Sequence, residues 1–196
     1  MQTIVIYGGA FNPPTTTGHR HVIEQLLQII DAGDVCIAPT YRHYLKDDIE
    51  TSFNTRLDMC RLTFAGLNVH IDDLERRAAL DGCDGSTIEL VEYLMKNNPN
   101  IDIKIIVGVD NADSINLWKR HAELITMASF IVVARGGYTP KLNWYKMKPH
   151  QFIDIPMHTI SSSMIRDALI QGNMEFVKQH IHPDVIPLLI RDTVCC

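Results

Sequence analysis

Six short apolar runs divide the chain, and stretches of helical periodicity separate them. The first run, Thr3 to Tyr7, is rich in β-branched residues and stops at Gly8-Gly9. An apolar run without polar alternation is typical of a strand that is buried on both faces of a parallel sheet. The other runs lie at 35–38, 68–71, 102–107, 130–134 and 152–155. Strands that alternate with helices predict an α/β fold, a doubly wound open parallel sheet with helices on both faces.

The intervals between the runs carry apolar residues at helical spacing. Helices are expected at 22–30, 56–65, 161–171 and 183–191, and Gly172 is a suitable residue to end the third of them. Ser86-Thr87-Ile88-Glu89 has the spacing of a capping box, which predicts that a helix begins there. The interval 138–151 shows little periodicity and is expected to be a surface loop. We therefore expect an α/β domain over 1–172, extended by short C-terminal helices over 173–196 of the same domain.

Length and composition limit the class of protein. The 196 residues are enough for one domain, and 46% of them are hydrophobic, which excludes a disordered chain. The formal net charge of -5 argues against a nucleic-acid partner, because phosphate contacts dominate such binding. The chain has neither an apolar run of roughly 18 residues nor a signal peptide, so no membrane partner is expected. Five cysteines without a C-x-x-C pair predict a reduced, cytoplasmic protein, with Cys195 and Cys196 in a frayed tail.

The loop after the first run concentrates small and hydroxylated residues. It reads Gly8-Gly9-Ala10-Phe11-Asn12-Pro13-Pro14-Thr15-Thr16-Thr17-Gly18-His19. Small residues let a ligand approach the backbone closely, and the start of the following helix offers free N–H groups that favour phosphate. His19 would direct a ring nitrogen to the same place, and Thr16 would add a hydroxyl. The glycines form neither G-x-G-x-x-G nor G-x-x-x-x-G-K-[ST], so neither the dinucleotide fingerprint nor the P-loop is supported.

A second segment of similar chemistry lies far along the chain. Ile160-Ser161-Ser162-Ser163-Met164-Ile165-Arg166 stands before and inside an expected helix. Serines at a helix start place hydroxyls beside unpaired N–H groups. Arg166 follows within the first turns, so a cation can reach the same anion. Taken alone, the segment is equally consistent with a capped helix that carries a solvated arginine.

Together the two segments resemble the signature motifs of the nucleotidyltransferase superfamily that carries a [His/Thr]-x-Gly-His motif. Thr16-Thr17-Gly18-His19 matches that motif, and 160–166 matches Ile-Ser-Ser-[Ser/Thr]-x-Ile-Arg, whose residues hold the triphosphate of ATP in the family. The resemblance implies a Rossmann-like nucleotidyltransferase (HIGH-type) fold. In the usual form of the first motif one residue separates it from the Asn-Pro pair, whereas Pro14 and Thr15 both intervene in this chain. Thr15 and Thr16 are therefore both candidates for the first motif position.

The middle of the chain resembles nicotinate and nicotinamide mononucleotide adenylyltransferases within this superfamily. Gly108 and Asp110, after the fourth run, match residues that lie near the adenosine in those enzymes. Trp118 matches a tryptophan that stacks on the pyridine ring, an arrangement that gains energy beyond its area burial. Asp110 as a helix N-cap and Trp118 as a packing aromatic are the structural alternatives.

Further positions follow from the same resemblance. Thr87 falls in a segment that lines the pyridine pocket in the family. Lys46 and Arg56 fall in a basic loop and on the helix after it, where Lys46 would face the mononucleotide phosphate. Arg135 matches an arginine near ATP. A solvated surface side chain is the alternative for Lys46 and for Arg135.

The resemblance thus implies three groups of site residues. The expected catalytic residues are His19, Thr16 and Arg166. The expected ATP-binding residues are Gly8, Gly9, Ala10, Phe11, Gly18, His19, Gly108, Asp110, Arg135, Ile160, Ser161, Ser162 and Arg166. The expected mononucleotide-binding residues are Phe11, Asn12, Lys46, Arg56, Thr87 and Trp118. No protein metal site is expected, and His180-Ile181-His182 is expected to be a solvated helix end.

The reaction that the resemblance implies is the attack of a mononucleotide phosphate on the α-phosphorus of ATP. The expected substrates are ATP, with Mg²⁺ on its triphosphate, and a pyridine mononucleotide; the products are deamido-NAD or NAD, and pyrophosphate. An adenylyltransferase with another acceptor, such as phosphopantetheine, and a catalytically silent nucleotide-sensing module are the alternatives. Trp118 argues against the first, and the intact His19 and Arg166 argue against the second. The sequence does not decide between nicotinate and nicotinamide, and it is compatible with a homo-oligomer.

Overall fold

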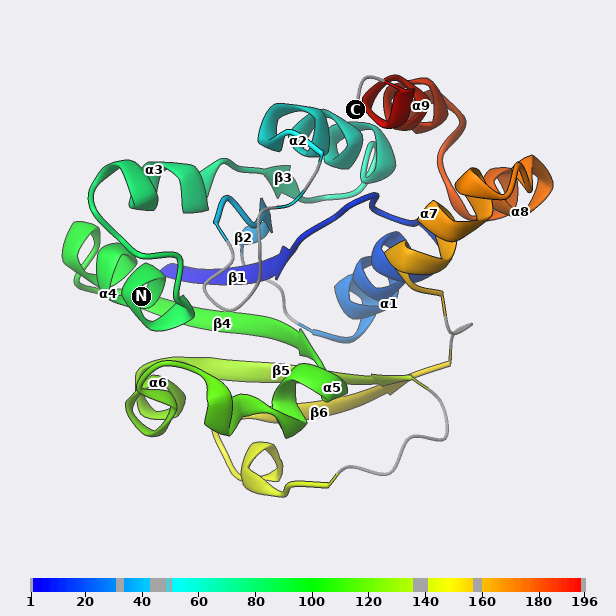
Figure 1. The fold of residues 1–196 in the computed structure, drawn as a ribbon. Helices are drawn as coiled ribbons and strands as arrows, with labels where there is room; N and C mark the ends of the chain where they lie inside the picture. The colour runs from blue at the N-terminus through cyan, green and yellow to red at the C-terminus, as the bar shows by residue number, and fades with distance from the viewer. Residues whose placement is uncertain are drawn as a thin grey trace.

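The computed structural model describes residues 2–30, 34–42, 49, 51–135, 141–156 and 160–194. Its centre is a six-stranded sheet in which all neighbouring strands are parallel. The strands are β1 (Gln2–Gly9), β2 (Asp34–Pro39), β3 (His70–Ile71), β4 (Ile101–Gly108), β5 (Ser129–Arg135) and β6 (Gln151–Ile155). Their order is β3-β2-β1-β4-β5-β6 (Figure 1). The predicted doubly wound parallel sheet is therefore confirmed, and each predicted apolar run forms one strand.

The longer helices lie where the periodicity predicts them. They are α1 (His21–Ile29), α2 (Phe53–Thr63), α4 (Thr87–Asn97) and α7 (Ser162–Ile170). Gly172 follows α7 with φ of 72°, a left-handed conformation that suits glycine after a helix. The predicted terminal helix consists of a 3-10 turn, η4 (Pro183–Val185), and α9 (Ile186–Val194). Within the described ranges, no helix has the length and apolar character needed to cross a bilayer.

The shorter helices have too few apolar positions to give a clear pattern. No sequence pattern predicts α3 (Leu74–Leu80), α5 (Val109–Asp113), η2 (Ile115–Leu117), α6 (His121–Met127) or η3 (Trp144–Lys146). α8 (Met174–His180) falls within 173–196, where short C-terminal helices are expected. Most of these elements are held by tertiary contacts. Leu74 of α3, Ala112 of α5 and Leu124 of α6, for example, are each at most 2% exposed and belong to one apolar cluster.

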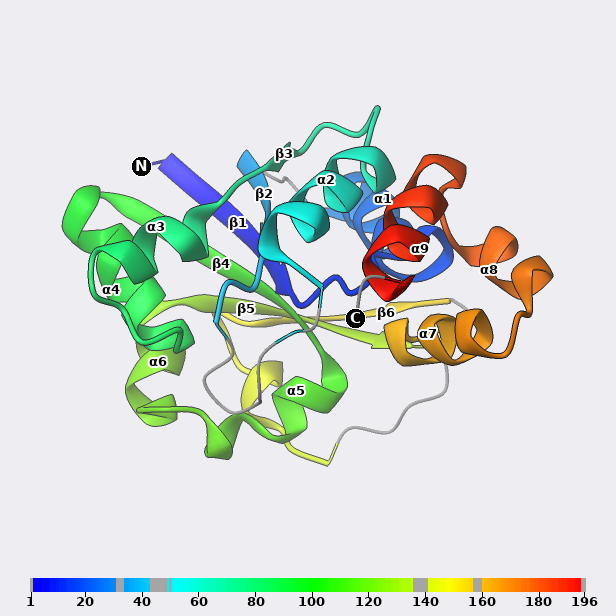
Figure 2. The ribbon, with the colours of Figure 1, turned by 45° about the horizontal axis from the view of Figure 1, so that its top comes forward.

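Alternate residues of each strand face opposite layers of helices. Val5 of β1 belongs to an apolar cluster with α1 and α2, whereas Ile6 belongs to a second cluster with α4, α5 and α6. In Figure 2, α1 and α2 lie above the strands, and α5 and α6 lie below them. Side chains of successive strand residues point to opposite faces, so continuous apolar runs are needed to fill both layers.

The C-terminal helices form a third apolar cluster with α2 and α7. The cluster joins Met59 of α2 and Ile165 of α7 to Val177 of α8, Val185 of η4 and Leu189 of α9. Each of these residues is no more than 2% exposed. Figure 1 shows α7, α8 and α9, in orange and red, gathered on the side of the molecule where α2 lies. This packing ties the C-terminal helices to the body of the molecule.

The prediction that 138–151 forms a surface loop is wrong in its middle. Tyr145 is fully buried, and the Trp144 ring packs edge-on against Phe130 with ring centroids 5.3 Å apart. Aromatic side chains contribute large buried areas, and two adjacent ones can hold a segment that has no periodicity of its own. The segment therefore belongs in part to the core.

The start of α4 agrees with the prediction, but its cap does not. Ser86 is the N-cap residue, yet its side chain makes no capping hydrogen bond. Glu89, the expected partner in the capping box, accepts a hydrogen bond from the Asp84 N–H at 2.7 Å instead. Glu89 therefore stabilises the turn before the helix, and the predicted capping box is not formed.

Candidate functional site

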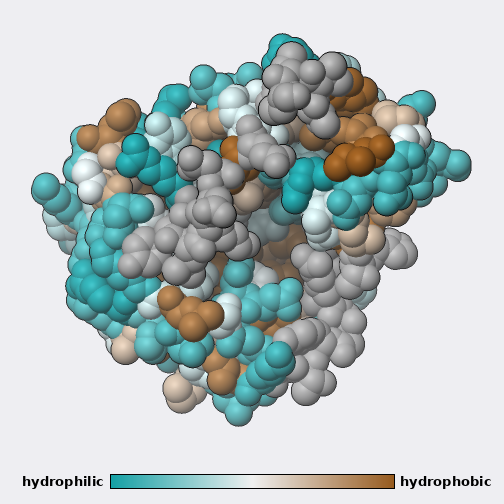
Figure 3. Space-filling view, viewed as in Figure 1, coloured by the Kyte–Doolittle hydropathy of each residue, from teal (hydrophilic) through white to brown (hydrophobic). Residues whose placement is uncertain are grey.

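The sheet order creates a topological switch point between β1 and β4. These strands are neighbours, but the chain proceeds from β1 to β2 on one side and from β4 to β5 on the other. In open α/β sheets, ligands bind outside the carboxyl ends of the strands at such a point. The carboxyl ends of the two strands are Gly8-Gly9 and Gly108. Figure 3 shows that the face in front of these strand ends is hollowed near its middle.

The chain after β1 enters its helix through a π-helical turn, η1 (Thr16–Arg20). The Arg20 N–H donates to the Thr15 carbonyl at 3.0 Å, so the turn closes over five residues instead of the four of an α-helix. α1 follows without a break. The turn therefore holds one residue more than an α-helical turn would.

Thr15 is the threonine that contacts His19. The Nδ1 atom of His19 lies 3.1 Å from the Thr15 amide nitrogen and 3.0 Å from Thr15 Oγ1. The His19 N–H in turn donates to that hydroxyl at 3.2 Å, which makes the fully buried Thr15 the N-cap of the turn. Thr16, which motif matching selects as a catalytic residue, is the half-buried first residue of the turn. Of the two candidates for the first motif position, Thr15 is the one beside the histidine.

Gly18 allows the two motif segments to approach each other. A Cβ atom at this position would lie 2.6 Å from Thr15 Oγ1 and 3.6 Å from the carbonyl oxygen of Ile160. The first separation is shorter than real Cβ atoms show, so any other residue would displace the threonine. Gly18 is therefore needed for its small size, and its predicted contact with ATP stays a prediction.

Two hydrogen bonds join the second motif to the loop. Ser162 Oγ donates to the Pro13 carbonyl at 2.8 Å, and Arg166 Nη1 donates to the Asn12 carbonyl at 2.6 Å. Ser161 is the N-cap of α7, so the start of this helix also lies against the loop. Asn12 is only 7% exposed, and its Oδ1 has no hydrogen-bond partner among the described residues. Buried polar groups are almost always paired, so this oxygen is a candidate acceptor for a ligand hydroxyl or a water.

Arg56 of α2 supports the loop. Its guanidinium donates to the Ala10 carbonyl at 2.8 Å and to the Thr51 carbonyl at 3.1 Å, and the residue is only 2% exposed. Burial lowers the pKa of Arg56, because desolvation disfavours the charged form. The contacts that the structure shows are with the loop backbone, and a contact with the mononucleotide stays a prediction.

Phe11 turns the chain within the loop. Its φ of 46° lies in the left-handed region that non-glycine residues seldom adopt. The ring is 1% exposed and packs edge-on against His19 and Phe64, at centroid distances of 5.2 Å and 6.0 Å. The buried ring fixes this conformation, so a ligand at the loop would meet the backbone of Phe11 and not its ring.

A small cavity of about 30 Å³ lies between α3 and α4. Its lining includes Thr87, as well as Glu75 and Ser86. Glu75 Oε2 accepts a hydrogen bond from the Tyr41 N–H at 2.9 Å, and burial raises the pKa of Glu75 to about 8. Sequence reasoning places Thr87 in this region but does not select Glu75. Acidic residues are common in the first turn of a helix, where they are usually solvated. The position of Glu75 in the sequence therefore gives no sign that it is buried.

The positions matched to the adenosine and pyridine sites follow β4. Gly108 is the N-cap of α5, and Asp110 is exposed in the first turn of that helix. Trp118 is half-buried and packs against the core, so its structural alternative and its predicted stacking role are compatible. Lys46 lies outside the described residues, as does the side chain of Arg135, whose backbone ends β5.

His180 is not the solvated helix end that the sequence suggests. The Nδ1 atom of His180 lies 2.7 Å from Thr17 Oγ1, and its ring packs against Phe176 with centroids 4.6 Å apart. The last residue of α8 thereby contacts the π-helical turn. A sequence pattern gives no sign of this pairing, because 163 residues separate the two partners.

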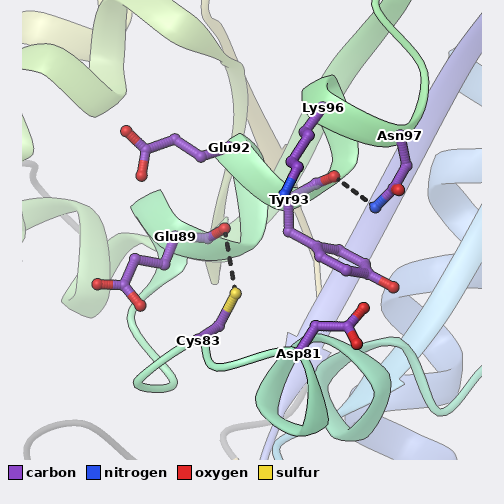
Figure 4. Close-up of a pocket in the computed structure, with 7 residues that line it drawn as sticks. All are labelled: Asp81, Cys83, Glu89, Glu92, Tyr93, Lys96 and Asn97. Carbon is purple, nitrogen blue, oxygen red and sulfur yellow. Dashed lines mark hydrogen bonds between the residues drawn. The ribbon is translucent and has the colours of Figure 1, made fainter.

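A larger cavity of about 480 Å³ lies along α4, away from the loop (Figure 4). It is lined by Asp81, Cys83, Glu89, Glu92, Tyr93, Lys96 and Asn97. Three carboxylates and one lysine make this cavity unfavourable for a phosphate, because like charges repel. Among the residues that the structure describes, no three His, Cys, Asp or Glu side chains form a group that could hold a metal ion.

The parallel sheet and the two joined motif loops define a nucleotidyltransferase of Rossmann-like fold. A model of the Cytidylyltransferase-like family matches residues 6–168. The chain therefore belongs to the Cytidylyltransferase-like family.

Relatives match over most of the chain. A Streptococcus pneumoniae protein named "Probable nicotinate-nucleotide adenylyltransferase" is 32% identical over 171 residues, which cover 85% of this chain and 77% of that protein. An Oceanobacillus iheyensis protein of the same name is 28% identical over 98% of this chain and 95% of its own. The fold is similar to that of the Plasmodium falciparum nicotinic acid mononucleotide adenylyltransferase complexed with NaAD. The TM-score is 0.81 at 24% identity, and the match covers 97% and 96% of the two chains.

Proposed function

We propose that the protein is a nicotinate-nucleotide adenylyltransferase that moves AMP from ATP to nicotinate mononucleotide. The observation that carries the proposal is the contact between the two motif loops, through Arg166 on the Asn12 carbonyl and Ser162 on the Pro13 carbonyl. This contact gathers the N–H groups and cations of both loops at one place beyond β1. The names of relatives that match over most of the chain support the choice of acceptor.

The reaction needs positioning and charge neutralisation more than proton transfer. An oxygen of the mononucleotide phosphate attacks the α-phosphorus of ATP; a new P–O bond forms, the bond to the β-phosphate bridge breaks, and pyrophosphate leaves. The attacking oxygen is already an anion, so a general base is unnecessary. His19 and Arg166 are the proposed catalytic groups on the triphosphate, and Lys46 and Arg135 are the proposed cations beside Arg166. Holding both anionic ligands in line supplies much of the rate enhancement.

We assign the remaining predicted positions by where they lie. Backbone groups of 8–11 and 160–162, together with Gly108 and Asp110, are the proposed ATP contacts. Asn12, Thr87 and Trp118 are the proposed mononucleotide contacts. Thr16 stays a proposed catalytic residue, although Thr15 is the threonine beside His19. Arg56 stays a proposed mononucleotide contact, although its guanidinium is hydrogen-bonded to the Ala10 carbonyl of the loop.

Mg²⁺ enters this proposal as a part of the ATP substrate. The ion keeps several waters and is bound through phosphate oxygens in such enzymes, with few ligands from the protein. Bound there, it would neutralise charge on the triphosphate.

We also propose that residues 1–172 and 173–196 act as one domain in the cytoplasm. The shared cluster of Met59, Ile165 and Leu189, and the contact of His180 with Thr17, support a single unit. The free and buried thiols of Cys36 and Cys60 fit a reducing compartment.

The test is the initial rate of pyrophosphate release from ATP and Mg²⁺ with an acceptor panel. The panel contains nicotinate mononucleotide, nicotinamide mononucleotide and phosphopantetheine. We expect the highest kcat/KM with nicotinate mononucleotide. A higher value with phosphopantetheine would overturn the proposal, and no release with any acceptor would favour a nucleotide-sensing module.

A pair of histidine variants tests the assignment of the site. His19→Ala is expected to lower kcat by about 100-fold or more, the usual effect of removing one preorganised donor. His70→Ala is the matched control, because His70 lies on β3 in an exposed pair with Asp34. Unfolding temperatures of both variants should stay close to that of the wild type. Equal activity of the two variants would contradict the role of His19.

A further inference from the structure

The loop between β1 and η1 has one residue more than the usual form of the first motif. We infer that this residue changes which threonine contacts His19. An α-helical turn closes from residue i to i−4, whereas the Arg20 N–H bonds to the Thr15 carbonyl, five residues earlier. Thr16–Thr17–Gly18–His19 matches the motif in sequence, with the threonine three residues before the histidine. In the wider turn it is Thr15, four residues before His19, that lies against the ring.

The contacts at His19 Nδ1 determine which ring nitrogen carries the proton. The Thr15 amide nitrogen, 3.1 Å away, has a hydrogen and no acceptor capacity, so Nδ1 must accept. Thr15 Oγ1 already accepts from the His19 N–H at 3.2 Å, so its own hydrogen can be directed to Nδ1 at 3.0 Å. A neutral imidazole that accepts at Nδ1 carries its proton at Nε2.

The surroundings leave the ring little freedom to turn. Thr15 is fully buried, and the Phe11 ring packs edge-on against the imidazole at a centroid distance of 5.2 Å. Gly18 has no side chain to displace the threonine, since a Cβ there would lie 2.6 Å from Thr15 Oγ1. The tautomer and the orientation of His19 are therefore set by the same small group of buried contacts.

We propose that Thr15 is the positioning residue of His19, which it holds as the Nε2–H tautomer with that N–H as the donor to the phosphate oxygen. The tautomer follows from the contacts alone, whereas the role of the donor rests on the proposed adenylyl transfer. Thr15 does not touch the reacting atoms and acts only through His19.

The first test is nitrogen-15 NMR of the imidazole in the unliganded wild-type protein near neutral pH. We expect an unprotonated, pyridine-type resonance for Nδ1 and a protonated, pyrrole-type resonance for Nε2. A proton on Nδ1 of the neutral ring would overturn the proposal. This measurement needs no substrate, so its outcome is independent of whether the proposed reaction is correct.

The second test compares three variants in kinetics and in the same spectrum. Thr15→Val keeps the shape and the backbone N–H but removes the hydroxyl, and we expect kcat to fall about tenfold, the effect of one net hydrogen bond, with less than a twofold change in KM for ATP. The Nδ1 resonance should shift as one hydrogen bond is lost. Thr15→Ser should restore both kcat and the resonance. Thr16→Val should lower kcat less than Thr15→Val and leave the resonance unchanged.

The outcomes separate a positioning role from a structural one. If Thr15→Val is unfolded, the Thr15→Ser variant and the wild-type spectrum still test the proposal. A folded Thr15→Val variant with wild-type kcat, or a Thr16→Val variant with the larger loss, would overturn it. If no pyridine mononucleotide is adenylylated by the wild type, the proposed function fails while the tautomer result stands.

Discussion

Arg56→Met isolates the contribution of a buried cation to the loop that follows β1. The substitution keeps a long side chain in place but removes the two guanidinium hydrogen bonds found among the described residues, to the Ala10 and Thr51 carbonyls at 2.8 Å and 3.1 Å. A hydrogen bond to a charged group contributes about 1.5–3 kcal/mol, and an acceptor left unpaired in a buried place costs about 1–3 kcal/mol. Part of this loss is offset, because the variant no longer buries a charge whose pKa burial has lowered.

We expect the free energy of unfolding to fall by about 3 kcal/mol, which corresponds to a drop in Tm of roughly 6–12 °C for a chain of this size. Urea denaturation at pH 7 measures the first quantity, and a thermal melt measures the second. Arg61→Met on the same helix is the matched control, since Arg61 forms an exposed pair with Asp58. Such a pair contributes about 0–1 kcal/mol. Equal losses in Arg56→Met and Arg61→Met would refute the reasoning.

Three further perturbations have directions that follow from the geometry. Gly18→Ala should lower kcat at least tenfold in the pyrophosphate assay, because its Cβ would lie 2.6 Å from Thr15 Oγ1, and wild-type kcat would contradict the role of the glycine. With a pKa of about 8 against an ordinary 4.5, folded Glu75 retains a proton that the unfolded chain has lost. The free energy of unfolding should therefore decline by up to about 1.4 kcal/mol per pH unit as the pH rises from about 4.5 to about 8. Urea denaturation of Glu75→Gln should lack that decline. His180→Ala should raise KM for ATP severalfold, since its contact with Thr17 at 2.7 Å is lost, and an unchanged KM would leave α8 without influence on the loop.

The sheet could be predicted from the sequence because its determinants are local. A strand that is buried on both faces must be apolar at every position, and runs such as 102–107 have no other simple interpretation. The alternation of these runs with helical periodicity then defines the class of fold. The short helices escape this reasoning, since α5 has five residues and depends on contacts such as those of the fully buried Ala112.

Only the part of the site that belongs to the two sequence motifs could be predicted. The sequence places His19 and Arg166 in one site, and the structure joins their loops through the Asn12 carbonyl. The roles of Thr15, Arg56 and His180 are different, because each depends on a partner that a motif does not specify. The choice between Thr15 and Thr16 depends on whether the turn is α or π, and this is decided by the packing of the whole loop.

The hydrogen bonds of the loop carbonyls connect these observations. Pro13 and Pro14 have no N–H groups, so this part of the loop contributes acceptors without the donors that usually accompany them. Side chains of two distant helices supply the missing donors: Arg56 bonds to the Ala10 carbonyl, and Arg166 and Ser162 bond to the carbonyls that follow. The second motif thus holds the first motif in place before any phosphate is bound. One nitrogen of Arg166 is already hydrogen-bonded to the loop. Substitution of Arg166 would therefore disturb the position of His19 as well as remove a charge from the site. The effects of substituting Arg166 and His19 should not be additive when both residues are changed in one protein.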